Sequence, residues 1–161
     1  IETALRISNN TVPPVIIEKI IDYGKEQLNQ PVDLLDGVAE VLPLLKEKYK
    51  LVVATKGDLL DQERKLRRSG IEHFFHHIEI MSDKQETDYL KLIKHLDIQP
   101  SEFMMIGNSL KSDVLPVLTV GGHAIHIPYH TTWAHEVVEE SVQHPGFRHF
   151  EKLKDILPEL I

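Results

Sequence analysis

Strand-like apolar runs alternate with helical patterns through the middle of this chain, and this alternation constrains the fold more than any other feature. Residues 50–55 contain a β-branched, apolar run, as expected of a strand that is buried on both faces. Shorter runs of the same character cover 77–81, 102–106 and 123–127. Helical patterns separate them, at about 58–69, about 86–96 and from about 113 onward. Such alternation predicts βαβ units, and therefore an α/β fold with a Rossmann-like parallel sheet and helices on both faces.

Charged residues and glycine mark the helix boundaries. Acidic residues, Asp58 first among them, open the segment 58–69, and Gly70 ends it, as the helix dipole and the preference for a C-terminal glycine predict. Upstream, another helix is predicted from Pro13 to Leu28, and Asp36 is the predicted N-cap of the helix that follows. The tail from residue 134 is expected to be helical in parts.

Length, charge and cysteine content narrow the classes of protein. A chain of 161 residues suits one domain, or a domain with a small appendage. The formal charge of −7 disfavours nucleic acid as a partner, because phosphate backbones attract basic surfaces. Cysteine is absent from the sequence, which excludes disulfides and thiolate metal sites. No apolar run approaches the roughly 20 residues of a membrane span, and no signal peptide is recognisable, so the cytoplasm is the expected location.

Polar residues follow the predicted strands at their carboxyl ends, where ligands of open α/β sheets bind. Thr55 closes one strand, and Asn108 and Asp113 follow another. The Thr55 hydroxyl is suited to donate a hydrogen bond to a phosphoryl oxygen. The backbone amides of Lys56 and Gly57 are expected to help, because glycine lets the backbone approach closely.

Lys84 and Asp113 complete the candidate site. The Lys84 ammonium is suited to neutralise the charge shared by a phosphate and an attacking carboxylate, which would otherwise repel each other. Asp113 is a hard oxygen ligand of the kind that Mg²⁺ prefers. Each residue alone has an ordinary structural interpretation: a strand-ending threonine, a solvated lysine, or an acid favoured by a helix dipole. Their order and spacing together favour a phosphoryl-transfer site.

Over about residues 34–128, these features resemble the core of the haloacid dehalogenase-like (HAD) superfamily. The strand that ends at Thr55 is similar to the second motif of the family, and Lys84 in its Ser-Asp-Lys context is similar to the third. The fourth motif, Gly-Asp-x-x-x-x-Asp or a variant, is matched by Gly107, Asn108 and Asp113.

The resemblance implies phosphoryl transfer to water. In the family an Asp attacks the phosphate, an aspartyl-phosphate forms, and water hydrolyses it with the help of Mg²⁺. By the same resemblance, Thr55 holds the phosphoryl group, Lys84 neutralises charge, and Asp113 binds the metal with Asn108 assisting. Asn108 stands where the family has an acid, so this site has one carboxylate fewer. A small phosphorylated metabolite is the expected substrate, dehalogenase chemistry is less favoured, and a monomer or homodimer is expected.

The first motif of the family, Asp-x-Asp-x-Thr after a strand, is missing from the sequence. Asp33 and Asp36 are no substitute, because no hydrophobic strand precedes them. In the family that strand lies between those matching 50–55 and 102–106, so its absence would leave backbone groups unpaired in the core. We therefore expect that an upstream segment is missing here, and that these 161 residues alone are inactive and poorly stable.

The resemblance also predicts how the chain is organised. Residues 1–33 are expected to be the end of a helical cap domain with its hinge. Residues 34–161 are expected to be the HAD-like α/β core without its first strand. Most of the cap is absent, and the cap largely sets specificity in such enzymes, so the sequence does not identify the substrate.

Two other interpretations of these residues belong to different classes of protein. A response-regulator receiver also uses Asp, Thr and Lys at strand ends, but its acceptor Asp precedes the Thr and its Lys comes last, whereas here the Asp-rich motif follows Lys84. The missing nucleophile and Asn108 favour a different alternative, a non-catalytic binding or dimerisation module or an inactive fragment of the same fold.

Ten histidines allow a weaker hypothesis of a zinc or nickel site. Pro128 disfavours a helical i, i+4 pair of ligands at His126 and His130. In family members with this tail, the segment after the last strand lies near the rim of the active site. Tyr129, His130 and Trp133 are therefore candidates for substrate contacts, with ordinary packing of a surface loop as the alternative.

Overall fold

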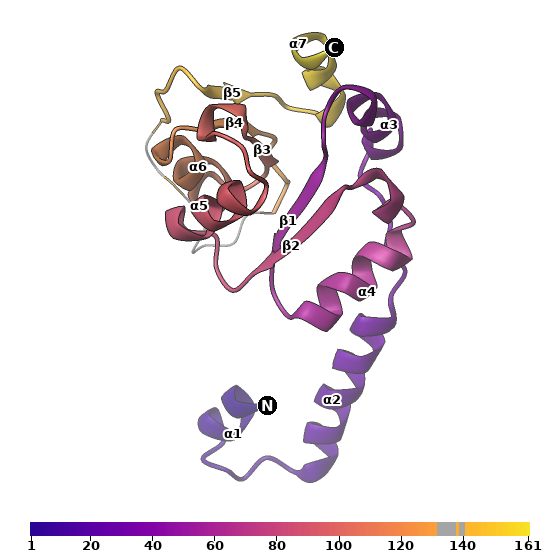
Figure 1. Ribbon diagram of the computed structural model, residues 1–161. Helices are drawn as coiled ribbons and strands as arrows, with labels where there is room; N and C mark the ends of the chain where they lie inside the picture. Colours follow the sequence, from indigo (N-terminus) through magenta and orange to yellow (C-terminus); the bar gives the residue numbers. More distant parts are fainter. Residues whose placement is uncertain (132–137, 139–140) are drawn as a thin grey trace. The chain divides into compact units, whose positions relative to one another are not determined.

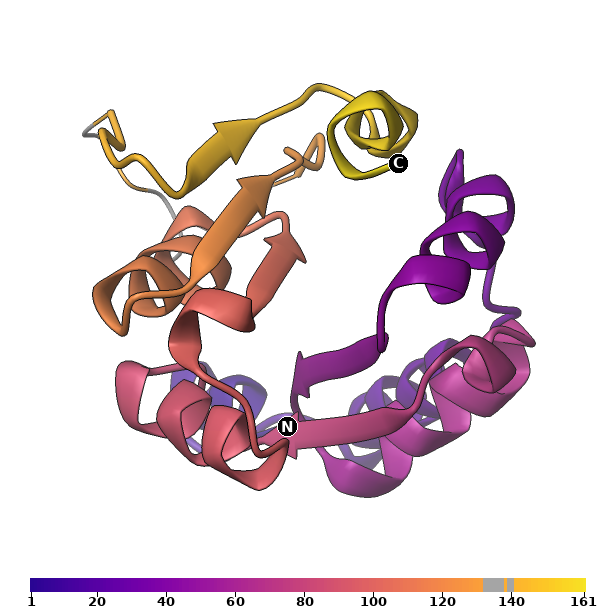
Figure 2. The same cartoon turned by 45° about the horizontal axis from the view of Figure 1, so that its top comes forward.

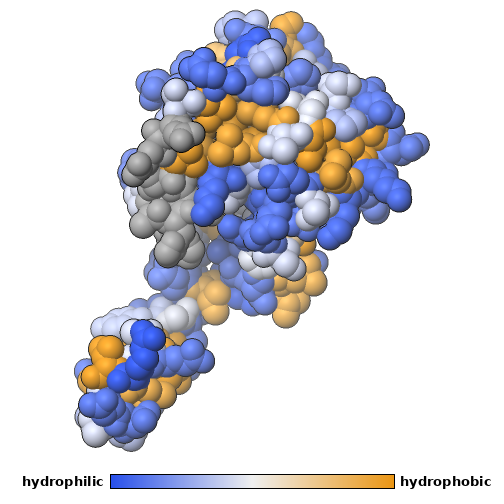
Figure 3. Space-filling model, turned by 90° about the vertical axis from the view of Figure 1, so that its left-hand side faces the viewer, coloured by the Kyte–Doolittle hydropathy of each residue, from blue (hydrophilic) through white to orange (hydrophobic). Residues whose placement is uncertain are grey.

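The computed structural model describes residues 1–131, 138 and 141–161, and the chain divides into two compact units, Ile1–Asp33 and Leu34–Ile161. The first unit contains α1 (Glu2–Ile7) and α2 (Pro14–Asn29), drawn in indigo and purple in Figure 1. Pro14 lies at the start of α2, where its fixed φ and missing N–H cost nothing. Neither helix buries a side chain. Apolar residues such as Ile7 are exposed, as the orange atoms at the surface in Figure 3 illustrate.

All strands of the second unit pair in parallel (Figures 1 and 2). They are β1 (Val52–Lys56), β2 (His77–Met81), β3 (Met104–Gly107), β4 (His123–His126) and β5 (Phe147–His149). β1 pairs with β2, and β4 lies between β3 and β5. The predicted Rossmann-like α/β class is confirmed, but the strands form two sheets, since no ladder joins β1 to β3 among the described residues.

Helices connect the strands, as the βαβ pattern requires. The α-helices are α3 (Val38–Lys48), α4 (Leu59–Ser69), α5 (Glu86–His95), α6 (Leu115–Thr119) and α7 (Leu157–Leu160). Short 3₁₀ turns are η1 (Glu72–Phe74), η2 (Pro100–Glu102) and η5 (Leu153–Ile156), and η3 (Leu110–Val114) is a π-helical turn. In the part of the chain that the structure describes, no helix has the length and apolar character needed to cross a bilayer.

Two apolar cores cover opposite faces of β3. Met105 packs into a core built on Tyr89 of α5 and Val117 of α6, and β1 contributes to the same core. Its neighbour Ile106 packs into the other core, with Val41 of α3 and residues of β4, η5 and α7. Successive strand residues point to opposite faces, so this division places helices on both sides. Both cores receive side chains from the two sheets or their flanks, and this packing holds the sheets together.

Some local predictions were wrong. Asp36 is not a helix cap: Gly37 is the N-cap of α3, with a φ of +87°. The positive φ favours glycine, and a Cβ on Gly37 would lie 2.8 Å from Cγ of Lys154, so the lysine side chain would also have to shift. The helix expected from about Asp113 begins as the π-helical turn η3 before α6. The tail is helical in parts, as predicted, since it contains η5 and α7, but it also contains β5, which was not predicted because it is too short to show a strand pattern.

Candidate active site

A shielded ion pair joins the loops that follow β2 and β3. The Lys84 ammonium lies 2.6 Å from Oδ1 of Asp113, and the two side chains are only 12% and 6% exposed. Lys84 comes shortly after the end of β2, and Asp113 lies in η3, after β3. Charges shielded from water in this way interact more strongly than surface charges. The structure therefore brings two of the sequence-predicted site residues into direct contact.

Main-chain groups hold the other oxygen of Asp113. Oδ2 accepts a hydrogen bond from the Ser109 N–H at 3.0 Å. Ser109 is also the N-cap of η3, because its hydroxyl accepts a hydrogen bond from the Ser112 N–H at 3.0 Å. Gly107 leaves room for this turn, since a Cβ there would lie 2.5 Å from Cγ of Asp113. The polar loop thus folds around one carboxylate and fixes both of its oxygens.

Tyr89 supports the same turn from α5. Its side chain is fully buried, and its hydroxyl donates a hydrogen bond to the Ser112 carbonyl at 2.9 Å. Burial, reinforced by the charges of Asp113 and Asp88, raises the pKa of Tyr89, so the phenol remains a protonated donor. Helical periodicity places Tyr89 on the inward face of its helix, but the sequence carries no signal for its bond to the loop after β3.

Thr55 is the penultimate residue of β1, and its side chain is engaged by α4. The Thr55 hydroxyl donates a hydrogen bond to Oε1 of Gln62 at 3.0 Å. Gly57 has a φ of +144°, and a Cβ there would lie 3.1 Å from the Gln62 amide nitrogen. Glycine therefore allows the tight connection between β1 and α4. Lys56 is exposed at the end of the strand.

The end of β1 is linked to the loop that carries Lys84. The Lys56 ammonium lies 3.9 Å from a carboxylate oxygen of Asp83, and both side chains are substantially exposed. Parallel pairing of Lys56 with Met81 places the two strand ends side by side. Among the described residues, the Thr55 hydroxyl bonds to Gln62 rather than to Lys84 or Asp113.

Asn108 is held by its main chain rather than by its side chain. The residue is exposed, and its carbonyl accepts a hydrogen bond from Nε2 of His126 at 3.0 Å. His126 ends β4 in register with Gly107 at the end of β3, and it is buried. The sequence predicted no role for His126 in this site. The available signal was its position near the end of a predicted strand, where site residues gather in such folds.

The donor chemistry of this loop fits Mg²⁺. Asp113 and Asn108 offer hard oxygens, and Mg²⁺ in phosphate-handling sites takes one or two carboxylates together with waters and phosphate oxygens. Oδ1 of Asp113 accepts from Lys84 and Oδ2 accepts from Ser109, and each carboxylate oxygen has more than one lone pair. By contrast, the described residues contain no group of three or more His, Cys, Asp or Glu side chains in metal-binding geometry. Trp133 and His135 lie outside the described residues.

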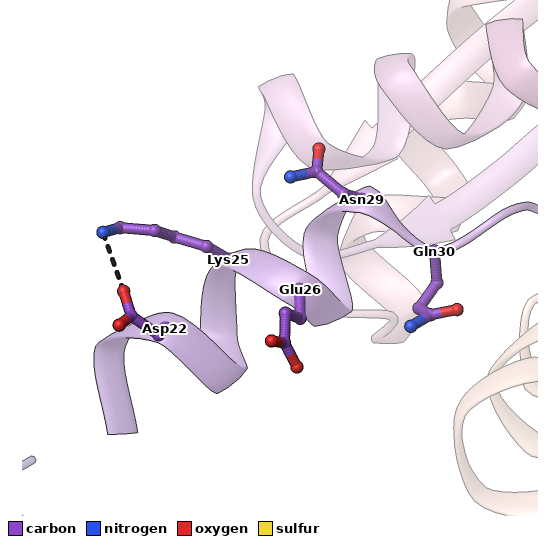
Figure 4. A pocket seen from close by; sticks show the side chains of 5 residues that line it. All are labelled: Asp22, Lys25, Glu26, Asn29 and Gln30. Atoms are coloured by element: carbon purple, nitrogen blue, oxygen red, sulfur yellow. Dashed lines mark hydrogen bonds and ion pairs between the residues drawn. The ribbon is translucent and has the colours of Figure 1, made fainter. Parts of the chain in front are cut away.

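A shallow pocket elsewhere in the chain carries no comparable chemistry. It lies along α2, and its walls come from this single helix (Figure 4). The lining residues are Asp22, Lys25, Glu26, Asn29 and Gln30. Asp22 and Lys25 form an exposed ion pair at 3.1 Å, and such pairs contribute little. All the predicted site residues belong to the other unit, Leu34–Ile161.

Comparison with known proteins gives consistent results. A family model for haloacid dehalogenase-like hydrolases matches residues 8–118. The glyceraldehyde 3-phosphate phosphatase of Pyrococcus furiosus is 28% identical over 123 residues, which are 73% of this chain and 51% of that protein. The enzyme of the same name from Methanopyrus kandleri is 25% identical over 114 residues, covering 68% of this chain and 49% of that protein. This chain therefore spans about half the length of these curated relatives.

A solved structure shares the same architecture. A haloacid dehalogenase-like family hydrolase from Xanthomonas campestris superposes on this chain with a TM-score of 0.85 and 34% sequence identity. The superposition covers 98% of this chain and 62% of that chain.

Proposed function

Because this chain belongs to the haloacid dehalogenase-like hydrolase family, we propose that it forms part of a Mg²⁺-dependent phosphatase that acts on a small phosphorylated metabolite. The observation that carries the proposal is the shielded Lys84–Asp113 ion pair, formed between loops that follow two parallel strands. Ligands of open α/β sheets bind beyond these strand ends. Relatives named glyceraldehyde 3-phosphate phosphatase support a phosphate ester as the substrate class.

The proposed roles follow from charge and hydrogen bonding. Thr55 donates its hydroxyl to a phosphoryl oxygen, and the main-chain amides of Lys56 and Gly57 offer further donors. Lys84 offsets the negative charge that accumulates when a carboxylate approaches the phosphate. The phosphoryl group passes to that carboxylate as the ester oxygen leaves, and water then releases inorganic phosphate.

Asp113 and Asn108 are the residues proposed to hold Mg²⁺. The ion would supply positive charge to the phosphoryl oxygens. Asp113 contributes a carboxylate whose orientation is fixed by Lys84 and Ser109. Asn108 contributes a neutral oxygen from an exposed position. The reduced charge of this pair predicts weaker metal binding than two carboxylates would give.

We place the nucleophilic aspartate on a strand outside residues 1–161, between β1 and β3. In support, β1 pairs only with β2 and β3 only with β4 among the described strands. A parallel strand between them would satisfy the backbone groups along both edges. On this proposal residues 1–33 are the end of a helical cap, residues 34–161 are the remainder of the catalytic core, and the 161 residues alone are inactive.

Release of inorganic phosphate from p-nitrophenyl phosphate by the full-length protein tests the function. We expect turnover that requires Mg²⁺ and is lost when EDTA removes the ion. Thr55→Val should lower kcat by about 10²–10³-fold, as the removal of one preorganised donor does in other enzymes. Lys84→Met should abolish turnover, because it removes the charge that offsets the two anions.

Matched substitutions control for general effects on the fold. Thr119→Val removes a hydroxyl that, among the described residues, donates to Leu115 of its own helix, and Lys91→Met removes an exposed ammonium from α5. Both variants should retain wild-type turnover. Unchanged kinetics for Thr55→Val would contradict the motif assignment. A full-length protein without hydrolase activity would instead favour the binding or dimerisation module.

A further inference from the structure

A chain of hydrogen bonds runs from the loop after β3 to a carboxylate beyond β5. Nε2 of His126 lies 3.0 Å from the Asn108 carbonyl oxygen, and Nδ1 of His126 lies 3.1 Å from Nδ1 of His149. Nε2 of His149 in turn lies 3.1 Å from a carboxylate oxygen of Glu151. His126 and His149 are register partners in the parallel β4–β5 ladder, which explains why their rings meet.

The direction of the first hydrogen bond is fixed by its acceptor. A carbonyl has no proton to give, so Nε2 of His126 must carry the proton that joins it to Asn108. In the neutral ring Nδ1 is then an acceptor, and Nδ1 of His149 donates to it. The Glu151 carboxylate also only accepts, so His149 makes both contacts as hydrogen bonds when each of its ring nitrogens carries a proton. The hydrogen-bond chain therefore selects one tautomer of His126 and one orientation of its ring.

The peptide group between Asn108 and Ser109 is held from both sides. Its carbonyl oxygen accepts from His126, and its N–H donates to Oδ2 of Asp113 at 3.0 Å. A trans peptide is planar, with its C=O and N–H pointing in opposite directions, and the described chain contains no cis peptide bond. Rotation of this plane would break both hydrogen bonds together. The orientation of the Asp113 carboxylate is thus coupled to His126, although Asp113 lies in η3 and His126 lies in β4.

We propose that His126 is a positioning residue of this site: it holds the Asn108–Ser109 peptide plane so that Ser109 orients Asp113 toward Lys84, and His149 fixes the His126 ring. The inference rests on the proposed phosphatase function, because it assigns a supporting role within that same loop. The loop is also supported from another direction by Tyr89, which bonds the Ser112 carbonyl. Tyr89 holds the middle of η3 through Ser112, whereas His126 holds the peptide group that precedes it.

Kinetics of the full-length protein with p-nitrophenyl phosphate give the first test. His126→Leu removes the donor and should lower kcat by about 10- to 100-fold, the usual effect of losing a residue that orients a site group, with a smaller change in KM. His126→Gln keeps an N–H donor in a similar position and should recover most of the turnover. His123→Leu is the matched control, because His123 is exposed at the other end of β4, and it should leave kcat unchanged.

His149→Leu provides a second test in case His126→Leu fails to fold. His149 is 43% exposed, so His149→Leu removes the outer hydrogen bond with little disturbance of the core. This variant should show a smaller loss of kcat in the same direction. A loss of thermal stability in His126→Leu and His149→Leu with full kcat in the folded fraction would overturn the positioning role and leave a purely structural one.

Nitrogen-15 NMR of the histidine rings supplies a readout that does not depend on activity. His126 should carry its proton on Nε2, with Nδ1 unprotonated. The backbone amide resonance of Ser109 should move in His126→Leu and stay in place in His123→Leu. The opposite tautomer, or an unmoved Ser109 amide, would overturn the inference. If the wild-type protein shows these signals but no hydrolase activity, the proposed function fails and the local geometry stands.

Discussion

Gly107 leaves the space that the Asp113 carboxylate occupies. A Cβ at this position would lie 2.5 Å from Cγ of Asp113, in a loop where Lys84 and Ser109 already fix both carboxylate oxygens. Gly107→Ala is therefore expected to lower the free energy of unfolding by about 1–3 kcal/mol, the usual cost of overpacking. It should also reduce phosphatase turnover, because the carboxylate must move. Chemical denaturation and steady-state kinetics of the full-length protein measure the two effects.

Gly24 offers the same substitution in an open environment. No atom lies within 4 Å of a Cβ added there, and Gly24 is inside α2. Gly24→Ala should therefore be neutral or stabilising by up to about 1 kcal/mol, since alanine is the better helix former. If Gly107→Ala were as stable and as active as the wild type, the Asp113 carboxylate would not need the space beside Gly107, and the prediction for Gly107→Ala would be wrong.

At the residue scale, the sequence identified which residue types form the candidate site, but it did not identify most of the contacts that hold them. Lys84 and Asp113 were selected because an ammonium and a carboxylate follow predicted strands, and the structure places them in contact. The sequence placed His126 near the end of a predicted strand, but no further signal indicated its support of the loop after β3. That support depends on the β3–β4 register, which places His126 beside Gly107, and on the direction of one peptide group, and no residue pattern fixes either. The His149 contact depends on β5, whose few residues carry no strand pattern.

At the scale of single elements, α4 depends on its ends, because it buries none of its side chains. Asp58 is its N-cap, and the carboxylate accepts a hydrogen bond from the Asp61 N–H at 3.0 Å. We predict that Asp58→Ala lowers the free energy of unfolding by about 1 kcal/mol, the typical value of a lost N-cap. Because Gln62 in the same turn accepts the Thr55 hydroxyl, fraying should also disturb the end of β1. Chemical denaturation of the full-length protein measures the stability change.

Asp58→Asn separates the contribution of the N-cap hydrogen bond from that of the negative charge at the N-terminus of α4. Asparagine caps helices about as well as aspartate, so this variant should lose only the few tenths of a kcal/mol that a negative charge contributes near a helix N-terminus. An equal loss in both variants would show that the charge matters and the hydrogen bond does not.

Elements with a strong pattern were predicted closely. The strand expected at 77–81 is β2, and the helix expected at 58–69 is α4, which ends at Gly70 in a left-handed conformation as its sequence indicated. Elements with weak patterns were missed. α1 was not predicted because its 6 residues are too few to show an apolar periodicity. The π-helical form of η3 follows from Ser109 and Asp113, whose hydrogen bonds compete with a regular helical start.

At the scale of the whole molecule, the unit Ile1–Asp33 has no core of its own. None of its residues is buried, and large apolar side chains such as Ile7 and Tyr23 are 77% and 67% exposed. A helix pair in this state gains little from hydrophobic burial, which supplies most of the stability of amphipathic helices in proteins. This property agrees with the proposal that the unit is part of a larger cap domain.

The open edges of β1 and β3 lead to the last prediction, which concerns the 161 residues by themselves. Backbone groups along those edges lack ladder partners among the described strands, and unpaired groups in a core are costly. The proposed strand between them also carries the nucleophile. Residues 1–161 produced alone should therefore release no phosphate from p-nitrophenyl phosphate and should unfold without a sharp cooperative transition. The full-length protein should release phosphate and should unfold cooperatively.

The mass of the sample of residues 1–161 must equal 18.5 kDa for the test to be valid. Turnover by this verified chain comparable with that of the full-length protein would mean that the nucleophile lies within the 161 residues, and the proposed position of the catalytic strand would be wrong.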